Sequence, residues 1–411
     1  MQQSFNEKFN NIQFLSPCAN NIDSIISEKS YIPFSDLICD YLDCVSKRLL
    51  QDSEAKTYPD VVTFAFFCRK ANIQGIKKGY ASIINGRLGR GITFHIAPSN
   101  VPINFAYSLV SGLLAGNRCI VRASSKNFPQ TRIVCRAFNE VAKANEFEIM
   151  QRIFSVIMYN HNSEITSSLS ELADIRIIWG GDNTIAEIRK SSLKPRAFDV
   201  TFADRYSFAI FDAEYVNSCI PEELKKIGQN FFNDTYLYDQ NACSSPRLIV
   251  WLGKNNDVIT AKEKFWNAIY DNISAKYELA PILSVDKLTA QYKCAVELEN
   301  AKLEKACDNL ITRITLSKLP VNITEYTCAG GCYLEYQAEN LESSQIETII
   351  NTKFQTLSYL GIEAKKIQSF VLEKGLSGID RIVPVGKTSD FGLVWDGYDL
   401  IMTMSRIVHL Q

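Results

Sequence analysis

The chain has 411 residues, of which 46% are hydrophobic and 22% charged, a composition typical of globular proteins. This length exceeds what one hydrophobic core usually serves, so two or more domains are expected. The 44 basic and 45 acidic residues leave a net charge of −1, which provides no overall positive field for nucleic acid. No apolar run reaches the ~18 residues of a membrane span, and the start lacks a signal-peptide pattern, so we expect a cytoplasmic protein.

The twelve cysteines are scattered along the chain, and many lie in apolar runs, as Cys68 and Cys119 do. Free cysteine is often a small buried hydrophobe, and a reduced setting fits this distribution. Cys328 and Cys332 are closely spaced, but no second Cys or His pair follows at zinc-finger distance. No metal site is therefore predicted.

The first 85 residues are predicted to be mostly helical and to pack on the domain that follows. Residues 86–238 alternate between short apolar runs and longer amphipathic runs. This alternation predicts a doubly wound parallel sheet with helices on both faces, that is, an α/β dinucleotide-binding domain. The predicted strands are 92–97, 119–123, 154–159 and 174–179, and the predicted helices are 102–115, 129–144 and 163–172.

Ligands of such sheets bind beyond the carboxyl ends of the strands. Here those ends carry small and polar residues, which suits a nucleotide. Ordinary turn chemistry explains any single one of these turns equally well. The candidates in chain order are Ser99 and Asn100, then Arg122, Ser124 and Ser125, then Gly180 and Gly181.

Two more strands, a helix and a small-residue stretch complete the middle of the chain. The stretch is "DQNACSSP", residues 239–246. We expect a domain boundary just ahead of Cys243, which places this cysteine on a hinge and gives a second α/β, catalytic domain over 239–384. Residues 385–411 could return to the dinucleotide-binding domain. The remaining predicted elements are strands 197–202 and 207–212, helices 221–231, 258–277 and 286–310, and strands 311–316 and 332–337.

Cys243 is the candidate nucleophile. Its neighbours Ala242, Ser244 and Ser245 leave backbone N–H groups accessible, and a thiolate attacking a carbonyl needs such donors around the oxyanion. On this context alone, a role as one more unreactive cysteine stays open. His95 lies inside an apolar strand and is interpreted as a core residue, whereas His161 follows a strand and is interpreted as a solvent-facing loop residue.

Several stretches together resemble the LuxC-type long-chain acyl-CoA reductases of the aldehyde dehydrogenase superfamily. They occur in the family's order and span roughly residues 86–406. The stretches are "HIAPSNVPINFAYSLVSGLLAGNRCIVRASSKNFPQT", "IIWGGDNTI", "FADRYS", "DQNACSSPR" and "GIDRIVPVGKTSDFGLVWDGYDL". The resemblance implies an aldehyde-dehydrogenase-like fold and reduction of a fatty acyl-CoA or acyl-carrier-protein thioester to the aldehyde.

The resemblance also implies roles for individual residues. Cys243 corresponds to the acylated nucleophile, and Asn100 to the asparagine whose amide holds the oxyanion. The cofactor-binding set would be Ser99, Arg122, Ser124, Ser125, Gly180 and Gly181. Asp380, Arg381 and Asp396 lie in the closing motif and are left outside the catalytic set.

Two departures from the superfamily pattern carry chemistry. In ordinary aldehyde dehydrogenases a glutamate activates water, but residues 201–207 hold no carboxylate at its place, so an acyl-enzyme would persist. In addition, the segment from Arg122 to Lys126 holds two cations and no acid. A guanidinium can clamp a phosphate, which favours NADPH over NADH.

Three alternatives stay open: an aldehyde-oxidising NAD(P) dehydrogenase, a non-redox acyltransferase using Cys243, and a non-catalytic subunit that keeps the fold. The resemblance further implies a homo-oligomer and partner enzymes, such as an acyltransferase or synthetase. Luminescence is one setting for this family, and lipid or natural-product assembly is another.

Overall fold

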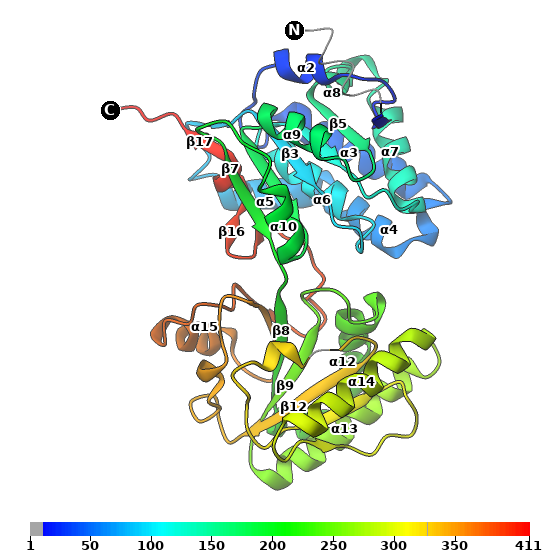
Figure 1. The fold of residues 1–411 in the computed structure, drawn as a ribbon, viewed down its shortest axis with the longest axis vertical. Coiled ribbons are helices and arrows are strands. Elements are labelled where there is room, and N and C mark those ends of the chain that lie inside the picture. The colour runs from blue at the N-terminus through cyan, green and yellow to red at the C-terminus, as the bar shows by residue number, and fades with distance from the viewer. Residues whose placement is uncertain (1–10, 327) are drawn as a thin grey trace. The chain divides into compact units, whose positions relative to one another are not determined.

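The computed structural model describes residues 11–326 and 328–411, and the chain divides into two compact units (Figure 1). The first unit contains the residues up to Ala203 together with Tyr398–Gln411, and the second is Asp204–Gly397. Within the described residues, no helix combines the length and the apolar character needed to cross a bilayer.

The first unit is built on a six-stranded sheet with the order β1-β5-β4-β3-β6-β7. β1 runs antiparallel to β5 and all other pairs are parallel, which confirms the predicted parallel sheet. The chain passes from β3 through β4 to β5 on one side and then crosses back to β6, so the switch point lies between β3 and β6. The strands are β1 (Gln13–Ser16), β3 (Ile92–Ile96), β4 (Arg118–Arg122), β5 (Phe154–Met158), β6 (Ile175–Trp179) and β7 (Phe198–Phe202).

Side chains alternate between the two faces of this sheet. In β3, Ile92, Phe94 and Ile96 join a buried cluster with residues of α9 and α10, whereas His95 bonds to Ser108 of α6. Both faces are therefore covered, which explains why these strands read as continuous apolar runs. The helices following the strands are α6 (Asn104–Leu114), α7 (Pro129–Val141), α8 (Met150–Ile153), α9 (Ser163–Leu172) and α10 (Asp182–Ile188).

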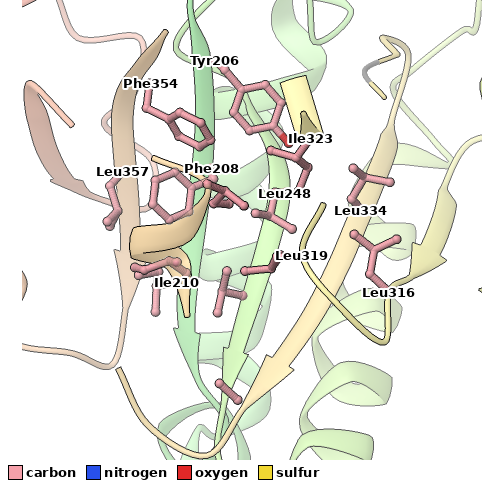
Figure 2. Packing of buried hydrophobic residues seen from close by; sticks show 14 of the residues in the cluster. Tyr206, Phe208, Ile210, Leu248, Leu316, Leu319, Ile323, Leu334, Phe354 and Leu357 are labelled. Atoms are coloured by element: carbon pink, nitrogen blue, oxygen red, sulfur yellow. The ribbon is translucent and has the colours of Figure 1, made fainter. Parts of the chain in front are cut away.

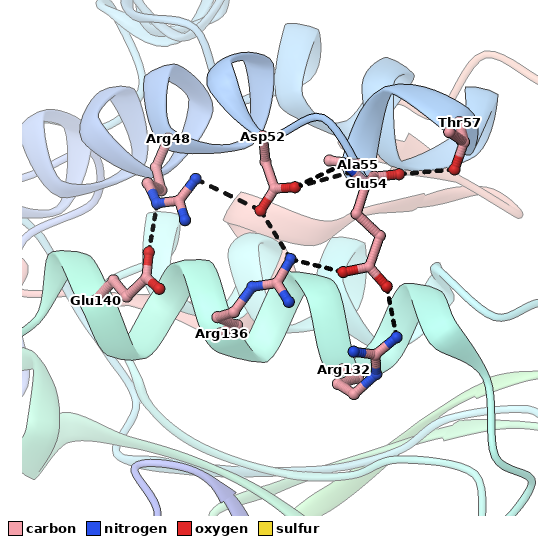
Figure 3. Close-up of polar contacts among 8 residues, drawn as sticks. All are labelled: Arg48, Asp52, Glu54, Ala55, Thr57, Arg132, Arg136 and Glu140. Atoms are coloured by element: carbon pink, nitrogen blue, oxygen red, sulfur yellow. Dashed lines mark hydrogen bonds and ion pairs between the residues drawn. The ribbon is translucent and has the colours of Figure 1, made fainter.

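Between residue 11 and β3, the described residues form the α-helices α2 (Ile22–Ser27), α3 (Asp36–Gln51), α4 (Pro59–Phe67) and α5 (Lys70–Tyr80). An ion network joins the end of α3 to α7 (Figure 3). Arg136 lies 2.7 Å from Asp52 and 2.9 Å from Glu54, and Arg48 pairs with Glu140. The N-terminal helices are thus fixed to a helix of the first sheet.

The last residues of the chain return to the first unit. β17 (Ser405–Ile407) pairs antiparallel with β2 (Arg87–Gly89), and it follows α16 (Leu400–Met404). The buried Asn117 side chain donates to the carbonyl of Met404 at 2.9 Å. The first unit is therefore made of two segments separated in the sequence by the whole second unit.

The second unit is built on a seven-stranded sheet with the order β10-β11-β12-β9-β8-β13-β14, in which only the β10 pair is antiparallel. Its strands are β8 (Tyr206–Asp212), β9 (Pro246–Leu252), β10 (Lys302–Leu303), β11 (Thr312–Thr315), β12 (Cys332–Ala338), β13 (Phe354–Leu360) and β14 (Arg381–Pro384). Its α-helices are α11 (Ala213–Ser218), α12 (Pro221–Thr235), α13 (Asn255–Ile273), α14 (Pro281–Glu297) and α15 (Ala364–Glu373). The second unit ends just after β15 (Val394–Trp395), and β16 (Tyr398–Asp399) belongs to the first unit.

Each face of the second sheet has its own core. On one face, Phe208, Leu248, Leu334 and Phe354 pack together (Figure 2). On the other, aromatic side chains of the strands pack against α12 and α13, as Trp251 does with Phe265. This double coverage again matches the apolar runs of the central strands.

Three features differ from the expectations. The first segment of the first unit ends at Ala203, so the expected boundary ahead of Asp239 falls inside the second unit. The reason is that β8 pairs with β9 and β13 and not with β7. The helix expected over 286–310 begins at Pro281 and ends at Glu297; beyond it Asn300 takes a left-handed conformation. The interval between 338 and 385 contains β13, α15 and β14, which the sequence analysis did not assign.

Candidate active site

Cys243 lies in the loop between the short helix η3 (Tyr236–Tyr238) and β9, and its side chain is partly buried. It is inside the second unit and not on a boundary between units. The Ser207 hydroxyl donates to the Cys243 carbonyl at 2.6 Å and accepts from the N–H of Thr356 at 3.2 Å. The start of β8 and the start of β13 therefore both hold the backbone of the cysteine.

Gln240 fixes the same loop from its other side. Its fully buried amide donates to the carbonyls of Pro246 and Cys332 and accepts from the N–H groups of Gly331 and Cys332, all at 2.9 to 3.0 Å. All four hydrogen-bonding positions of the amide are therefore used. The loop is thus joined to the beginning of β12.

A third anchor comes from Asp234, a buried residue of α12. Its carbonyl accepts from Ser245, while its carboxylate accepts from the N–H groups of Gly386 at 2.6 Å and Thr388 at 3.0 Å. Burial raises the pKa of Asp234 to about 6, against the two N–H donors, which lower it. Asp234 therefore holds both the loop that carries Cys243, through Ser245, and the closing motif, through Gly386 and Thr388.

The sulfur of Cys243 contacts Gln355, the second residue of β13. Gln355 Nε2 lies 3.6 Å from Cys243 Sγ and also donates to Oδ1 of Asp396. Asp396 is largely buried, and its Oδ2 lies 3.9 Å from Arg205 Nη1. Arg205 itself pairs with Asp380. These residues gather at the amino ends of β8, β9, β13 and β14.

The surroundings of Cys243 favour the protonated thiol. Burial raises the pKa of Cys243, and the negative charge of Asp396 raises it further, while the Gln355 hydrogen bond, the cysteine's own N–H and Arg205 lower it. Burial likewise raises the pKa of Asp396, whereas the charge of Arg205 and the hydrogen bond from Gln355 lower it. The sequence analysis missed Gln355 and had left Asp396 outside the catalytic set.

The other predicted site residues lie in the first unit, at the carboxyl edge of its sheet. Ser99 and Asn100 follow β3 and are exposed, and Gly180 and Gly181 follow β6. Arg122 is the last residue of β4, and Ser124 and Ser125 lie in the turn after it. Because β4, β3 and β6 are neighbours, this edge brings together all seven residues: Ser99, Asn100, Arg122, Ser124, Ser125, Gly180 and Gly181.

This edge suits a dinucleotide. The Arg122 guanidinium lies over the Tyr159 ring at 4.7 Å and donates to the Tyr159 carbonyl, but its buried Nε has no hydrogen-bond partner among the described residues. Gly181 caps α10 without a side-chain hydrogen bond, and a Cβ at Gly180 would lie 3.1 Å from Thr184. A cation and the exposed backbone N–H groups of glycines can bind phosphate, and hydroxyl groups can bind ribose.

The two histidines lie as interpreted from the sequence. His95 is buried, its Nδ1 lies 2.8 Å from Ser108 Oγ, and burial lowers its pKa to about 3. His161 is exposed. Cys68 and Cys119 are buried, and no group of metal-binding side chains occurs within residues 11–326 and 328–411.

The family model described as acyl-CoA reductase (LuxC) matches residues 77–319, which is more than half of the chain. The chain belongs to the LuxC family of acyl-CoA reductases. Among curated proteins, it is 24% identical over 324 residues to the long-chain acyl-protein thioester reductase of Photorhabdus luminescens, covering 78% of this chain and 63% of that protein. It is 26% identical over 210 residues to the Vibrio harveyi protein of the same name, and the match covers 49% of this chain and 42% of that protein.

The LuxC chain described here thus spans less than two thirds of the length of these relatives. Solved aldehyde dehydrogenases share its fold. Aldehyde dehydrogenase 21 from Physcomitrella patens has a TM-score of 0.66 at 11% identity, covering 94% of this chain and 88% of that one. The Thermus thermophilus 1-pyrroline-5-carboxylate dehydrogenase has a TM-score of 0.64 at 11% identity, and the match covers 98% of this chain and 84% of that one. The fold is that of the aldehyde dehydrogenases, and family and fold together imply a nicotinamide cofactor.

Proposed function

We propose that this LuxC-family chain reduces a long-chain acyl thioester to the aldehyde through an acyl group carried on Cys243. The observation that carries the proposal is the position of Cys243: partly exposed, in a loop fixed by Ser207 and Gln240, with an amide N–H directed at its sulfur. The relatives are named as acyl-protein thioester reductases, so the donor thiol belongs to a protein or to coenzyme A.

In the first half-reaction, the Cys243 thiolate attacks the thioester carbon, and the bond to the donor thiol breaks. The donor thiolate departs and takes up a proton, leaving the acyl group on Cys243. The N–H of Cys243, which lowers the pKa of its own thiol, is a donor on the nucleophile itself and suits the developing oxyanion. The amide of Asn100 is the second donor that the family resemblance implies.

In the second half-reaction, the acyl group on Cys243 would be reduced by hydride, the chemistry that a nicotinamide cofactor would supply when bound. The resulting thiohemiacetal oxyanion would then collapse: its carbon–sulfur bond breaks, the aldehyde leaves, and Cys243 returns as the thiolate. Residues 201–207 place no carboxylate where aldehyde dehydrogenases have their water-activating glutamate. The acyl group would therefore persist on Cys243 until it is reduced.

We infer NADPH as the cofactor. Arg122 and Lys126 give the turn after β4 a positive charge, and the turn has no acid to repel a 2′-phosphate. Replacing Arg122 with Gln should raise KM for NADPH many-fold while changing KM for NADH little. Equal effects on the two cofactors would contradict this inference, and Arg118→Gln, at the other end of β4, is the control for lost charge.

The test of the function uses the whole chain with acyl-CoA and acylated carrier protein of graded chain length. Intact-protein mass spectrometry should show one acyl group, absent from Cys243→Ser, and added NADPH should convert it to aldehyde. Acylation without reduction would indicate an acyltransferase, and acid formation from aldehyde without a thiol would indicate an aldehyde dehydrogenase. An acyl group found on another residue would exclude Cys243.

A further inference from the structure

The Gln355 amide has one orientation available to it. Its Nε2 carries two hydrogens, one directed at Asp396 Oδ1 and the other at Cys243 Sγ, 3.6 Å away. Its Oε1 lies 3.3 Å from Thr356 Oγ1. Turning the amide over would place a carbonyl oxygen against a carboxylate, so Asp396 determines that an N–H faces the sulfur.

Asp396 is itself held in place from several directions. Its backbone is in the left-handed region, with φ of 49°, and Gly397 follows with φ of 75°. Aspartate tolerates this conformation better than most residues, although it remains unfavourable. The carboxylate is nearly inaccessible and lies 3.9 Å from Arg205, whose other nitrogens donate to the carbonyls of Lys353 and Phe354.

The cations near Cys243 are already engaged with other groups. Arg205 pairs with Asp380 as well as facing Asp396. Arg381 stacks on Trp395 at 4.6 Å and donates to three backbone carbonyls, and Arg247 donates to the carbonyl of Cys328. Among the charged groups around Cys243, the carboxylate of Asp396 therefore has the largest effect on the sulfur.

We propose that Gln355 is a positioning residue for Cys243, oriented by Asp396, and that the two act on the sulfur in opposite directions. The N–H of Gln355 stabilises the thiolate, whereas the carboxylate of Asp396 opposes it. Acylation removes the charge from the sulfur and with it the repulsion from Asp396. The carboxylate of Asp396 therefore favours the acylated cysteine over the free thiolate, an inference that deepens the proposed function and rests on it.

The test measures how fast iodoacetamide alkylates Cys243 between pH 6 and pH 10, peptide by peptide, in the full chain without thioester or cofactor. Asp396→Asn should move the midpoint to lower pH and speed alkylation several-fold at pH 7. Gln355→Leu, which removes the N–H, and Gln355→Glu, which keeps the shape but adds charge, should both move the midpoint to higher pH.

The controls separate this effect from unfolding. Asp390→Asn removes an exposed charge from the same closing motif, and Gln337→Leu removes a glutamine from the far end of β12. Neither should move the Cys243 midpoint, and the exposed Cys18 and Cys307 should react alike in every variant.

Unchanged midpoints in the Gln355 and Asp396 variants, or a shift of Asp396→Asn to higher pH, would overturn the proposal. Because the assay needs no substrate, this outcome is independent of whether the chain reduces thioesters. Where thioester acylation does occur, its pH profile should shift in the same directions.

Discussion

Gln240 bonds to both backbone groups of Cys332, accepting from its N–H and donating to its carbonyl, each at 2.9 Å. The side chain thereby makes with β12 the two hydrogen bonds that a residue of a neighbouring strand would make. It is one of the anchors, with Ser207 and Asp234, that join the loop of Cys243 to the second unit.

Replacing Gln240 with Leu should leave these buried groups without partners. An unsatisfied buried group costs about 1–3 kcal/mol, so we expect a loss of several kcal/mol in the free energy of unfolding. Urea denaturation measures the loss, and Gln337→Leu, which breaks one long hydrogen bond, should cost far less. A change no larger than that of the control would show that the loop is held by other contacts.

Arg176 is the buried cation of the first unit. It lies 2.7 Å from Asp199 and also donates to Ser170 and to the carbonyls of Ile188 and Ser191. Arg176→Met should destabilise the chain by about 3–5 kcal/mol, because it leaves a largely buried carboxylate poorly compensated.

The matched control is Arg189→Met. Arg189 lies 3.3 Å from the same carboxylate but is exposed, so its loss should cost under about 1 kcal/mol. Similar melting temperatures for the two variants would argue against a buried role for Arg176.

Gly112 allows α6 to lie close to the sheet. A Cβ there would be 2.7 Å from Cys119 Sγ and 2.8 Å from His95 Nε2, distances that real contacts do not show. Gly112→Ala should therefore destabilise the first unit by about 1–3 kcal/mol despite the better helix propensity of alanine. Gly75→Ala on α5 has no atom within 4 Å and should leave the melting temperature unchanged or raise it.

The ion network between α3 and α7 should make stability depend on pH. Burial alone would raise the pKa of Asp52, but its bond to Arg136 lowers it, and the same arginine lowers the pKa of Glu54. Carboxylates with lowered pKa stabilise the folded chain above their unfolded pKa of about 4 and lose this effect as the pH falls.

Arg136→Met should therefore lower the melting temperature at pH 7 and have a smaller effect well below pH 4, where both carboxylates become protonated in the folded chain as well. Lys143→Met, an exposed lysine just beyond α7, is the control for lost charge. A difference between Arg136→Met and the wild type that stays constant across this range would show that the ion pairs contribute nothing.

How much the sequence could predict depended on which residues the strands bury. β3 to β6 were predicted because their two covered faces require apolar residues throughout, and the carboxyl-end candidates followed from that. β13 was missed because it buries Gln355, Thr356 and Ser358, which break the apolar pattern. The residue that contacts the Cys243 sulfur was hidden for the same reason.

Cys243 itself could be singled out from its small neighbours and from the family resemblance. Asp396 could not, because one acid in a closing motif looks the same in sequence whether it caps a turn or lies buried beside Gln355. The boundary between units was misplaced because β7 and β8 are equally apolar, and only strand pairing assigns them to different sheets.

The pairing of β17 with β2 has a consequence for synthesis on the ribosome. The second unit, Asp204–Gly397, emerges in full before the residues that complete the first unit. Until Met404 and Ser405 have been synthesised, Asn117 lacks one acceptor and β2 lacks its partner strand, so the first unit stays incomplete until the second has been translated.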